Sequence, residues 1–206
     1  MTSQMAGPLS GLRVLELTGE HAQFCGKLMA DLGADVIKVE PPGGQGTREV
    51  GPFLDDEAGP ERSLYFWHYN TSKRGITLDI TKPEGQEVFR KLAATAGLVL
   101  ESFTAGYLPS LGLGYDSLSA DNPGLIMCSV TPFGQDGPWR DYQTSDLLHL
   151  AAGGQMASSG YDVEDVPDAP PIAPGGGNAW HIASHYSYIA IMGALYHWDF
   201  TGEGQY

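Results

Sequence analysis

The chain has 206 residues, of which 42% are hydrophobic, so it is long enough to bury a core and is expected to form one globular unit. Its 25 Asp and Glu residues outnumber its 11 Lys and Arg residues, and the net charge of −14 argues against nucleic acid as a partner. Neither a signal peptide nor an apolar run of roughly 18 residues is present, so we expect no membrane insertion and a cytoplasmic location.

The apolar pattern predicts alternating strands and helices. Strands are expected at residues 13–18, 35–40, 76–80, 98–103 and 125–133. Helices are expected at residues 21–31, from 81 to about 96, at 145–153, and from 179 to about 198. Because a crossover helix delivers the next strand in the same direction, the predicted fold is α/β, with a largely parallel, Rossmann-like sheet and flanking helices.

Turn and cap signals refine the ends of these elements. Thr81 and Glu84 have the spacing of a capping box. Ser145 is expected to cap the helix that Gly153 and Gly154 end. Residues 204–206 have the pattern of the first residues of a further strand.

Two long irregular segments, residues 41–62 and 158–178, are dense in Gly, Pro and acidic residues. Segments of this length are usually functional lids, subunit-contact arms or flexible stretches. Doubly wound sheets bind ligands beyond the carboxyl ends of their strands. The loops after Thr18, Glu40 and Phe103, and the one after Phe133, are therefore the candidate ligand-binding loops. No dinucleotide or P-loop glycine motif occurs in them.

Several blocks of sequence together resemble the family III CoA-transferases, the formyl-CoA transferase and carnitine-CoA transferase group. The blocks are GLRVLELT, ADLGADVIKVEPPGG, YNTSKRGITLDITKPEG, LVLESFTAG with LGLGYDSL, SVTPFGQDGPWRD and GALYHWDFTGEGQ. They occur in family order between Pro8 and Tyr206. The resemblance implies that residues 1–206 are the N-terminal part of the family's large domain, with the C-terminal half absent. It also implies an interlocked homo- or heterodimer with a family III subunit.

The resemblance implies covalent catalysis on an Asp. That carboxylate attacks an acyl-CoA thioester, and a small carboxylic acid finally receives the CoA. The Asp is expected fourteen residues before Ala194, and Trp180 occupies that position. An indole cannot accept an acyl group or a proton. No Asp or Glu lies between Asp168 and Asp199, so a small shift of alignment does not restore the carboxylate.

Contacts to coenzyme A, as part of the acyl-CoA substrate, are also implied by the resemblance. The candidate contact residues are His21, Ala22, Lys73, Arg74, Ser102 and Phe103. The cations that meet the CoA phosphates in formyl-CoA transferases correspond to Pro41, Ser110 and Gln143, so binding by this chain is expected to be weak. Lys73 and Arg74 have the alternative of pairing with acidic side chains. The run of residues 175–177 either holds a thioester oxygen or is a loop with positive φ angles.

Other residues leave alternatives open. Trp180 is a core aromatic, a plug in the former active site, or a wall of a substrate pocket. His181 and His185 share one helix face, as a metal pair or as a polar stripe, and no third ligand is marked by spacing, so no metal is expected. Cys25 and Cys128 are expected to be reduced core thiols.

Three functions are therefore compatible with the sequence. The chain is a non-catalytic subunit that acts with a catalytic paralogue, since Trp180 replaces the nucleophile. Alternatively, it is an active acyl-CoA hydrolase, isomerase or lyase that uses another residue, such as His181 as a base. The third hypothesis is a CoA-binding or sensor module without turnover.

Overall fold

A computed structural model describes residues 7–161 and 164–206 of the chain. At its centre is an all-parallel, five-stranded sheet with the order β3-β2-β1-β4-β5. The strands are β1 (Arg13–Leu17), β2 (Asp35–Glu40), β3 (Arg74–Thr77), β4 (Leu98–Glu101) and β5 (Ile126–Ser129). This topology confirms the predicted α/β, Rossmann-like fold. Strand order reverses between β1 and β4, which makes their carboxyl ends the place to look for a ligand site.

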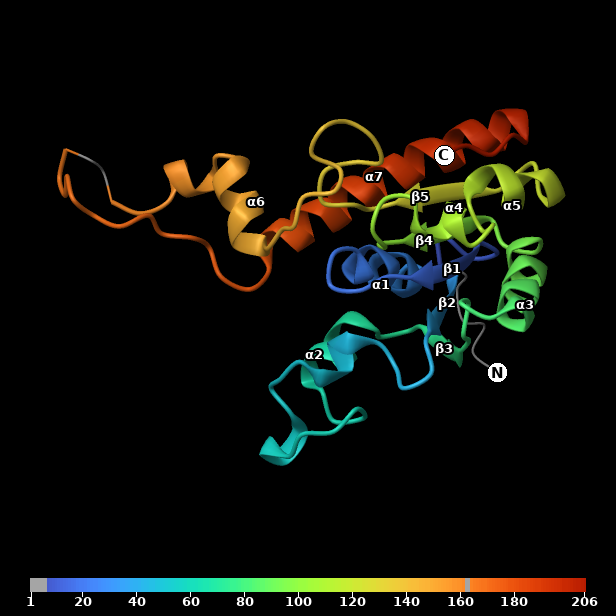
Figure 1. The fold of residues 1–206 in the computed structure, drawn as a ribbon, viewed down its shortest axis with the longest axis horizontal. Coiled ribbons are helices and arrows are strands. Elements are labelled where there is room, and N and C mark those ends of the chain that lie inside the picture. Colours follow the sequence, from blue (N-terminus) through green and yellow to red (C-terminus); the bar gives the residue numbers. More distant parts are fainter. Residues whose placement is uncertain (1–6, 162–163) are drawn as a thin grey trace.

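Helices cover both faces of the sheet (Figure 1). On one face, α1 (Gln23–Asp31) and α7 (Asn178–Thr201) pack on Val14, Val36 and Leu98. On the other face, α3 (Pro83–Ala93), α4 (Tyr107–Ser110) and α5 (Tyr115–Asp121) pack on Leu15, Ile37 and Val99. Side chains alternate between the two faces of a strand, so β1 directs Val14 and Glu16 toward α1 and α7.

The remaining helices lie beyond the carboxyl ends of the strands (Figure 1). The segment after β2 contains the short 3-10 helices η1 (Gly46–Glu49) and η2 (Leu54–Asp56), followed by α2 (Leu64–Tyr69). The segment after β5 leads to α6 (Asp146–Ala152) and η3 (Gln155–Ser158). Residues 162 and 163, within the second long irregular segment, and residues 1–6 lie outside the described part of the chain. In the described part, no helix is both long and apolar enough to cross a membrane.

The predicted capping box at Thr81 is wrong. Both the Thr81 amide and its hydroxyl donate to Asp79 Oδ1, over 3.0 and 2.6 Å, and the residue that precedes α3 is Lys82. The physical reason is Pro83, which begins the helix and has no N–H group to be capped. The turn at Asp79 also ends β3 earlier than predicted.

Two further strand ends differ from the prediction. Strand β5 stops at Ser129 rather than at residue 133, and β4 stops at Glu101. Residues 204–206 are not assigned as a strand, but Gln205 O accepts a hydrogen bond of 3.0 Å from Met127 N beside β5. Only glycine fits before it, because a Cβ on Gly204 would stand 1.9 Å from the carbonyl oxygen of Leu125.

The predicted cap of α6 is confirmed, since Ser145 Oγ accepts a hydrogen bond of 3.3 Å from Leu148 N. We expect Ser145→Ala to lower the free energy of unfolding by about 1 kcal/mol, because the first turn of α6 loses its acceptor. Ser145→Asp retains an acceptor and should remain close to the wild type. Urea denaturation followed by circular dichroism measures both variants, and equal midpoints for Ser145→Ala and the wild type would refute a stabilising cap.

Candidate functional site at the carboxyl edge of the sheet

The loops after β1 and β4 meet at the end of the sheet where the carboxyl ends of the strands lie, here called the carboxyl edge. Gly19 N donates a hydrogen bond of 2.9 Å to Ser102 Oγ, which ties the two loops together. Phe103 follows, with its amide bound to Glu101 Oε2 over 2.7 Å and its ring 4.7 Å from that of Tyr107. Phe103 also lines a cavity of about 290 Å³ at this edge, together with Pro41. Ser102 and Phe103 thus lie among the loops at the carboxyl ends of the strands, and their contact with a ligand stays a prediction.

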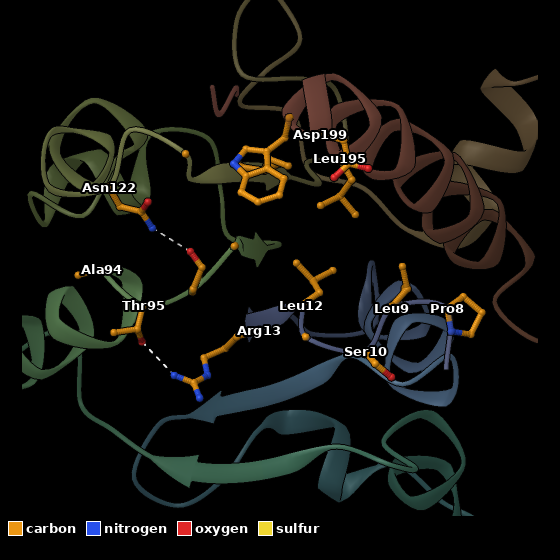
Figure 2. A pocket seen from close by; sticks show the side chains of 16 residues that line it. Pro8, Leu9, Ser10, Leu12, Arg13, Ala94, Thr95, Asn122, Leu195 and Asp199 are labelled. Carbon is orange, nitrogen blue, oxygen red and sulfur yellow. Dashed lines mark hydrogen bonds between the residues drawn. The ribbon is translucent and has the colours of Figure 1, made fainter. Parts of the chain in front are cut away.

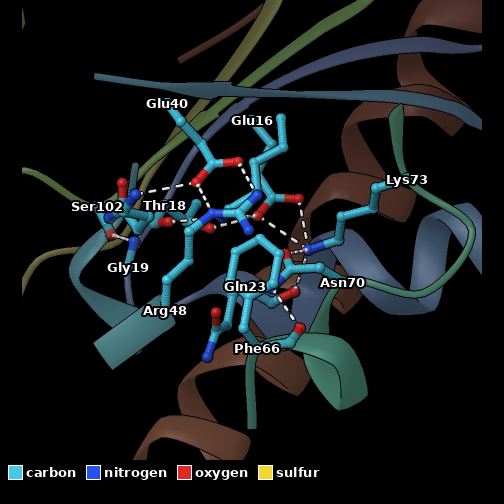
Figure 3. Close-up of polar contacts among 12 residues, drawn as sticks. Glu16, Thr18, Gly19, Gln23, Glu40, Arg48, Phe66, Asn70, Lys73 and Ser102 are labelled. Atoms are coloured by element: carbon cyan, nitrogen blue, oxygen red, sulfur yellow. Dashed lines mark hydrogen bonds and ion pairs between the residues drawn. The ribbon is translucent and has the colours of Figure 1, made fainter. Parts of the chain in front are cut away.

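A buried charge cluster supports the loop after β1 (Figure 3). Glu16 of β1 pairs with Lys38 Nζ over 3.0 Å and with Lys73 Nζ over 2.8 Å, and these three side chains are at most 2% exposed. Lys38 also donates to Thr18 O over 2.9 Å, and Lys73 to Gln23 O over 2.8 Å. The cluster therefore holds both ends of the segment that carries His21 and Ala22.

Opposing effects set the pKa values of these groups. Burial alone would raise the pKa of Glu16, but the ammonium groups of Lys38 and Lys73 hold it below its usual value. Burial lowers the pKa of Lys73 to about 8, against the opposite effect of Glu16. Lys73 Nζ makes its contacts with protein groups, which is the ion-pairing alternative raised by the sequence.

Arg74 lies apart from the other candidate residues. Its guanidinium binds the carboxylate of Asp35 through two hydrogen bonds of 2.8 and 2.7 Å. Asp35 begins β2 and Arg74 begins β3, so this pair lies at the strand-start edge, opposite the ligand-binding loops. The structure does not bring Arg74 together with His21, Ser102 or Phe103.

The strand-start edge also contains a cavity of about 530 Å³, shown in Figure 2. Three of its polar side chains are bonded to other protein groups: Arg13 donates to Thr95 Oγ1 over 3.1 Å and to Asp35 Oδ2 over 3.2 Å, and the Asn122 amide donates to the carbonyls of Ala93 and Ala96. These contacts join the loops at this edge and give no indication of a reactive site.

The long segment after β2 is fixed to the sheet by Arg48, a contact that sequence reasoning missed. The Arg48 guanidinium binds Glu40 through hydrogen bonds of 2.7 and 2.8 Å and lies 3.8 Å from the centre of the Phe66 ring. Burial raises the pKa of Glu40, but its bonds with Arg48 and Gln45 N lower it below its usual value. The segment predicted as a lid or arm therefore has a built anchor at the end of β2.

Trp180 lies in the first turn of α7, which begins after Gly177 with a φ of 71°. Its indole stands against two imidazoles, with ring centres 4.2 Å from His21 and 5.3 Å from His149. His21 precedes α1 and His149 belongs to α6, so three segments meet at this ring. Gly176 and Gly177 both have positive φ angles, as the loop alternative for this run expects.

Asp146 is the carboxylate that sequence reasoning missed. Its Oδ1 accepts a hydrogen bond of 2.8 Å from Ala179 N, next to Trp180. Asp146 follows the cap residue of α6, and only the packing of α6 on α7 brings it to the start of the second helix. A carboxylate in this place satisfies an unpaired amide and interacts favourably with the positive end of the α7 dipole.

His181 points toward α2. Its Nε2 lies 2.5 Å from Tyr69 Oη, and its ring centre is 4.9 Å from that of Phe24. Burial lowers its pKa below the usual value. His185 Nδ1 lies 2.8 Å from His181 O. Among residues 7–161 and 164–206, no group of three His, Cys, Asp or Glu side chains is placed to hold a metal ion.

Pro41, Ser110 and Gln143, the positions at which the resemblance implies cations, are exposed. Arg140 is a cation that the sequence reasoning missed; its Nη2 donates to Ala105 O in the loop after β4 over 3.5 Å.

Neither cysteine forms a disulfide: Cys25 is buried and Cys128 is partly buried. Burial raises the pKa of both thiols, in agreement with inert core cysteines.

The parallel sheet, its strand order and the loops gathered at one edge define an α/β protein of the Rossmann-like class. The family model described as CoA-transferase family III matches residues 9–206. The chain therefore belongs to CoA-transferase family III.

Similar proteins support this assignment. The chain is 41% identical over 201 residues to the succinyl-CoA:(R)-benzylsuccinate CoA-transferase subunit BbsE of Thauera aromatica, covering 98% of this chain and 48% of that protein. It is 42% identical over 203 residues to a succinate–glutarate CoA-transferase of Agrobacterium fabrum, covering 97% and 50%. A crystal structure of a CAIB/BAIF family protein from Brucella suis matches with a TM-score of 0.88 and 42% identity, covering 97% and 52%. The chain spans about half the length of these relatives.

Proposed function

We propose that this chain is a non-catalytic part of a family III CoA-transferase and works with a catalytic family III subunit that provides the carboxylate nucleophile. The observation that carries the proposal is Trp180, which stands at the start of α7 with its indole between His21 and His149. No covalent acyl or CoA intermediate forms on an indole. The Thauera relative, itself named as a subunit, supports a division of this kind.

The CoA thioester approaches the carboxyl edge of β1 and β4 in this proposal. His21, Ser102 and Phe103 border that edge, whereas Ala22 is completely buried. Lys73 contributes indirectly, because its hydrogen bond to Gln23 O holds the β1 loop. Arg140 supplies one cation near the loop after β4. The resemblance implies three cations that bind the CoA phosphates. Because Pro41, Ser110 and Gln143 stand at those positions and are uncharged, the partner subunit makes most of the contacts with CoA in this proposal.

The reaction class follows the names of the relatives. We propose succinyl-CoA as the CoA donor and a dicarboxylic acid as the acceptor, since the Thauera and Agrobacterium relatives are named for succinyl-CoA with benzylsuccinate and for succinate with glutarate. Both steps of the reaction, removal of CoA from the donor and its transfer to the acceptor, need a carboxylate nucleophile at the reacting carbonyl. The carboxylate of Asp146 lies beside Trp180, but its Oδ1 already accepts a hydrogen bond from Ala179 N.

Intact-mass spectrometry tests the proposal. The chain alone, and its complex with a co-purified family III subunit, are mixed with succinyl-CoA and quenched in acid. We expect a succinyl or CoA adduct on the partner and no adduct on this chain. An adduct on this chain in the sample without a partner would overturn the proposal. Loss of that adduct in Asp146→Asn would identify Asp146 as the nucleophile.

The alternative functions lack such support. His181 faces Tyr69 and Phe24 and does not line the cavity beside Trp180, so its contacts do not favour a catalytic base at a thioester. A sensor without turnover would still bind CoA, and calorimetric titration of this chain with CoA measures that property. We expect a dissociation constant of about 1 mM or weaker, because each charge-assisted hydrogen bond lost removes about 1.5–3 kcal/mol.

A further inference from the structure

The outer face of α7 is apolar and exposed. Five large side chains on this face are between 40% and 75% exposed: Ile182, Tyr186, Ile189, Tyr196 and Phe200. Gly193, which lies among them, is exposed as well. On the opposite side of the same helix, Ile191 is buried against the sheet. The helix is therefore apolar on both sides, a pattern typical of helices that have a packing partner on each side.

The exposed residues follow a regular spacing. Gly193 and the five large side chains, together called the α7 stripe, recur at alternating intervals of four and three residues. That spacing is the heptad pattern along which two helices pack against each other. The α7 stripe spans about 27 Å of helix at a rise of about 1.5 Å per residue. No Asp, Glu, Lys or Arg occurs in α7 before Asp199, so no charged side chain interrupts the stripe. The α7 stripe thus has the form of a seam for a second helix.

The α7 stripe is symmetric about Gly193. Tyr186 and Phe200 both lie seven positions from Gly193. Ile189 and Tyr196 lie four and three positions from it. Two antiparallel copies of α7 therefore set Tyr186 of each copy against Phe200 of the other. Gly193 meets Gly193 of the other copy at the two-fold axis, where the lack of a side chain lets the helices approach closely. Such a contact uses the same surface on both copies, as a closed two-fold dimer requires.

Charge favours the antiparallel arrangement over the parallel one. Acidic residues occur at the end of α7, as Asp199 and Glu203, whereas the first half of the helix contains none. In a parallel pair the acidic residues of the two copies would stand together and repel each other. In an antiparallel pair they flank His185 of the other copy, which lies eight positions before Gly193. The positive end of each helix dipole then also lies near the negative end of the other.

We propose that the α7 stripe binds the α7 stripe of a second copy of this chain, as an antiparallel helix pair with Gly193 at the two-fold axis. The pairing depends on the surface of α7 and does not rest on the proposed function. A complex with a catalytic family III subunit then contains two copies of this chain, joined through α7. The stripe is smaller than the about 800 Å² that each partner buries in a standard interface, so the expected dissociation constant is about 10–100 µM.

Sedimentation equilibrium of the 206-residue chain measures this self-association. Gly193→Arg sets two like charges against each other at the axis and should weaken the dimer at least about 10-fold. A Cβ at Gly193 meets no atom within 4 Å, and Arg is a better helix former than Gly, so the variant should keep the fold, as circular dichroism can check. The matched control is Val88→Arg, at an exposed apolar position of α3, which should dimerise as the wild type does. A wild-type chain that stays monomeric at about 300 µM, or a dimer that Gly193→Arg leaves unchanged, would overturn the proposal.

A charge swap tests the two-fold axis itself. Gly193→Glu should also be monomeric, but its equimolar mixture with Gly193→Arg should form a heterodimer, because opposite charges then meet at the axis. Absence of that heterodimer would refute the position of the axis. A wild-type chain that is monomeric alone and loses its binding to a catalytic family III subunit in Gly193→Arg would assign the α7 stripe to that subunit, against this proposal. Dimerisation through α7 together with a succinyl adduct on this chain would refute only the proposed function.

Discussion

Glu16→Gln is expected to lower the free energy of unfolding by about 3–5 kcal/mol, the largest single effect on stability that we predict for this chain. Glu16 is completely buried and is the carboxylate between Lys38 and Lys73, whose side chains are both 2% exposed. Removal of its charge leaves two buried ammonium groups without compensation. Urea denaturation followed by circular dichroism measures the change.

Two controls separate the effect of burying uncompensated charge from the effect of a Glu-to-Gln change in general. Glu87→Gln breaks the exposed pair with Lys91 and should leave the denaturation midpoint unchanged. The triple variant Glu16→Leu, Lys38→Met, Lys73→Met replaces the whole cluster with apolar side chains and should recover most of the stability. A loss below about 1 kcal/mol in Glu16→Gln would show that the lysines shed their protons or reach water at little cost.

The charge cluster shows what periodicity predicts and what it does not. The pattern of residues 35–40 predicted β2 with the boundaries that the structure has. Lys38, in the middle of β2, nevertheless lies in the core. Glu16, 22 residues earlier, is its partner on the neighbouring strand β1 and compensates its charge. Such pairing depends on strand order, which local pattern does not contain, although two charged residues within apolar runs were a visible signal.

The same limit applies to the candidate site. Counting along the collinear blocks assigned Trp180 to the nucleophile position, which stays a prediction; the structure shows Trp180 in the first turn of α7. Asp146 and His149 reach it only through the packing of α6 on α7, so no local pattern marked them. The capping box failed for a local reason: Pro83 changes which amides need an acceptor, and Asp79 took the hydroxyl of Thr81.

The second large effect concerns turnover. In the complex that we propose with a catalytic family III subunit, replacement of that subunit's nucleophilic carboxylate by its amide is expected to lower kcat by roughly 10⁴-fold or more. Trp180→Phe in this chain should lower kcat by less than about 10-fold, because an indole forms no covalent intermediate and Phe retains an aromatic ring at this position. Steady-state transfer from succinyl-CoA to a dicarboxylic acid, the proposed donor and class of acceptor, measures both.

A rescue experiment makes this division of labour refutable. Trp180→Asp places a carboxylate at the start of α7, where Asp146 already accepts a hydrogen bond from Ala179 N and where the imidazoles of His21 and His149 stand close by. Combined with the disabled partner, it should not restore transfer, since Pro41, Ser110 and Gln143 still offer no cation to the CoA phosphates. Recovery to within about 10-fold of the intact complex would mean that this chain retains a complete CoA site and lacks only the nucleophile. The non-catalytic role would then depend on residue 180 alone, and not on the whole carboxyl edge of the sheet.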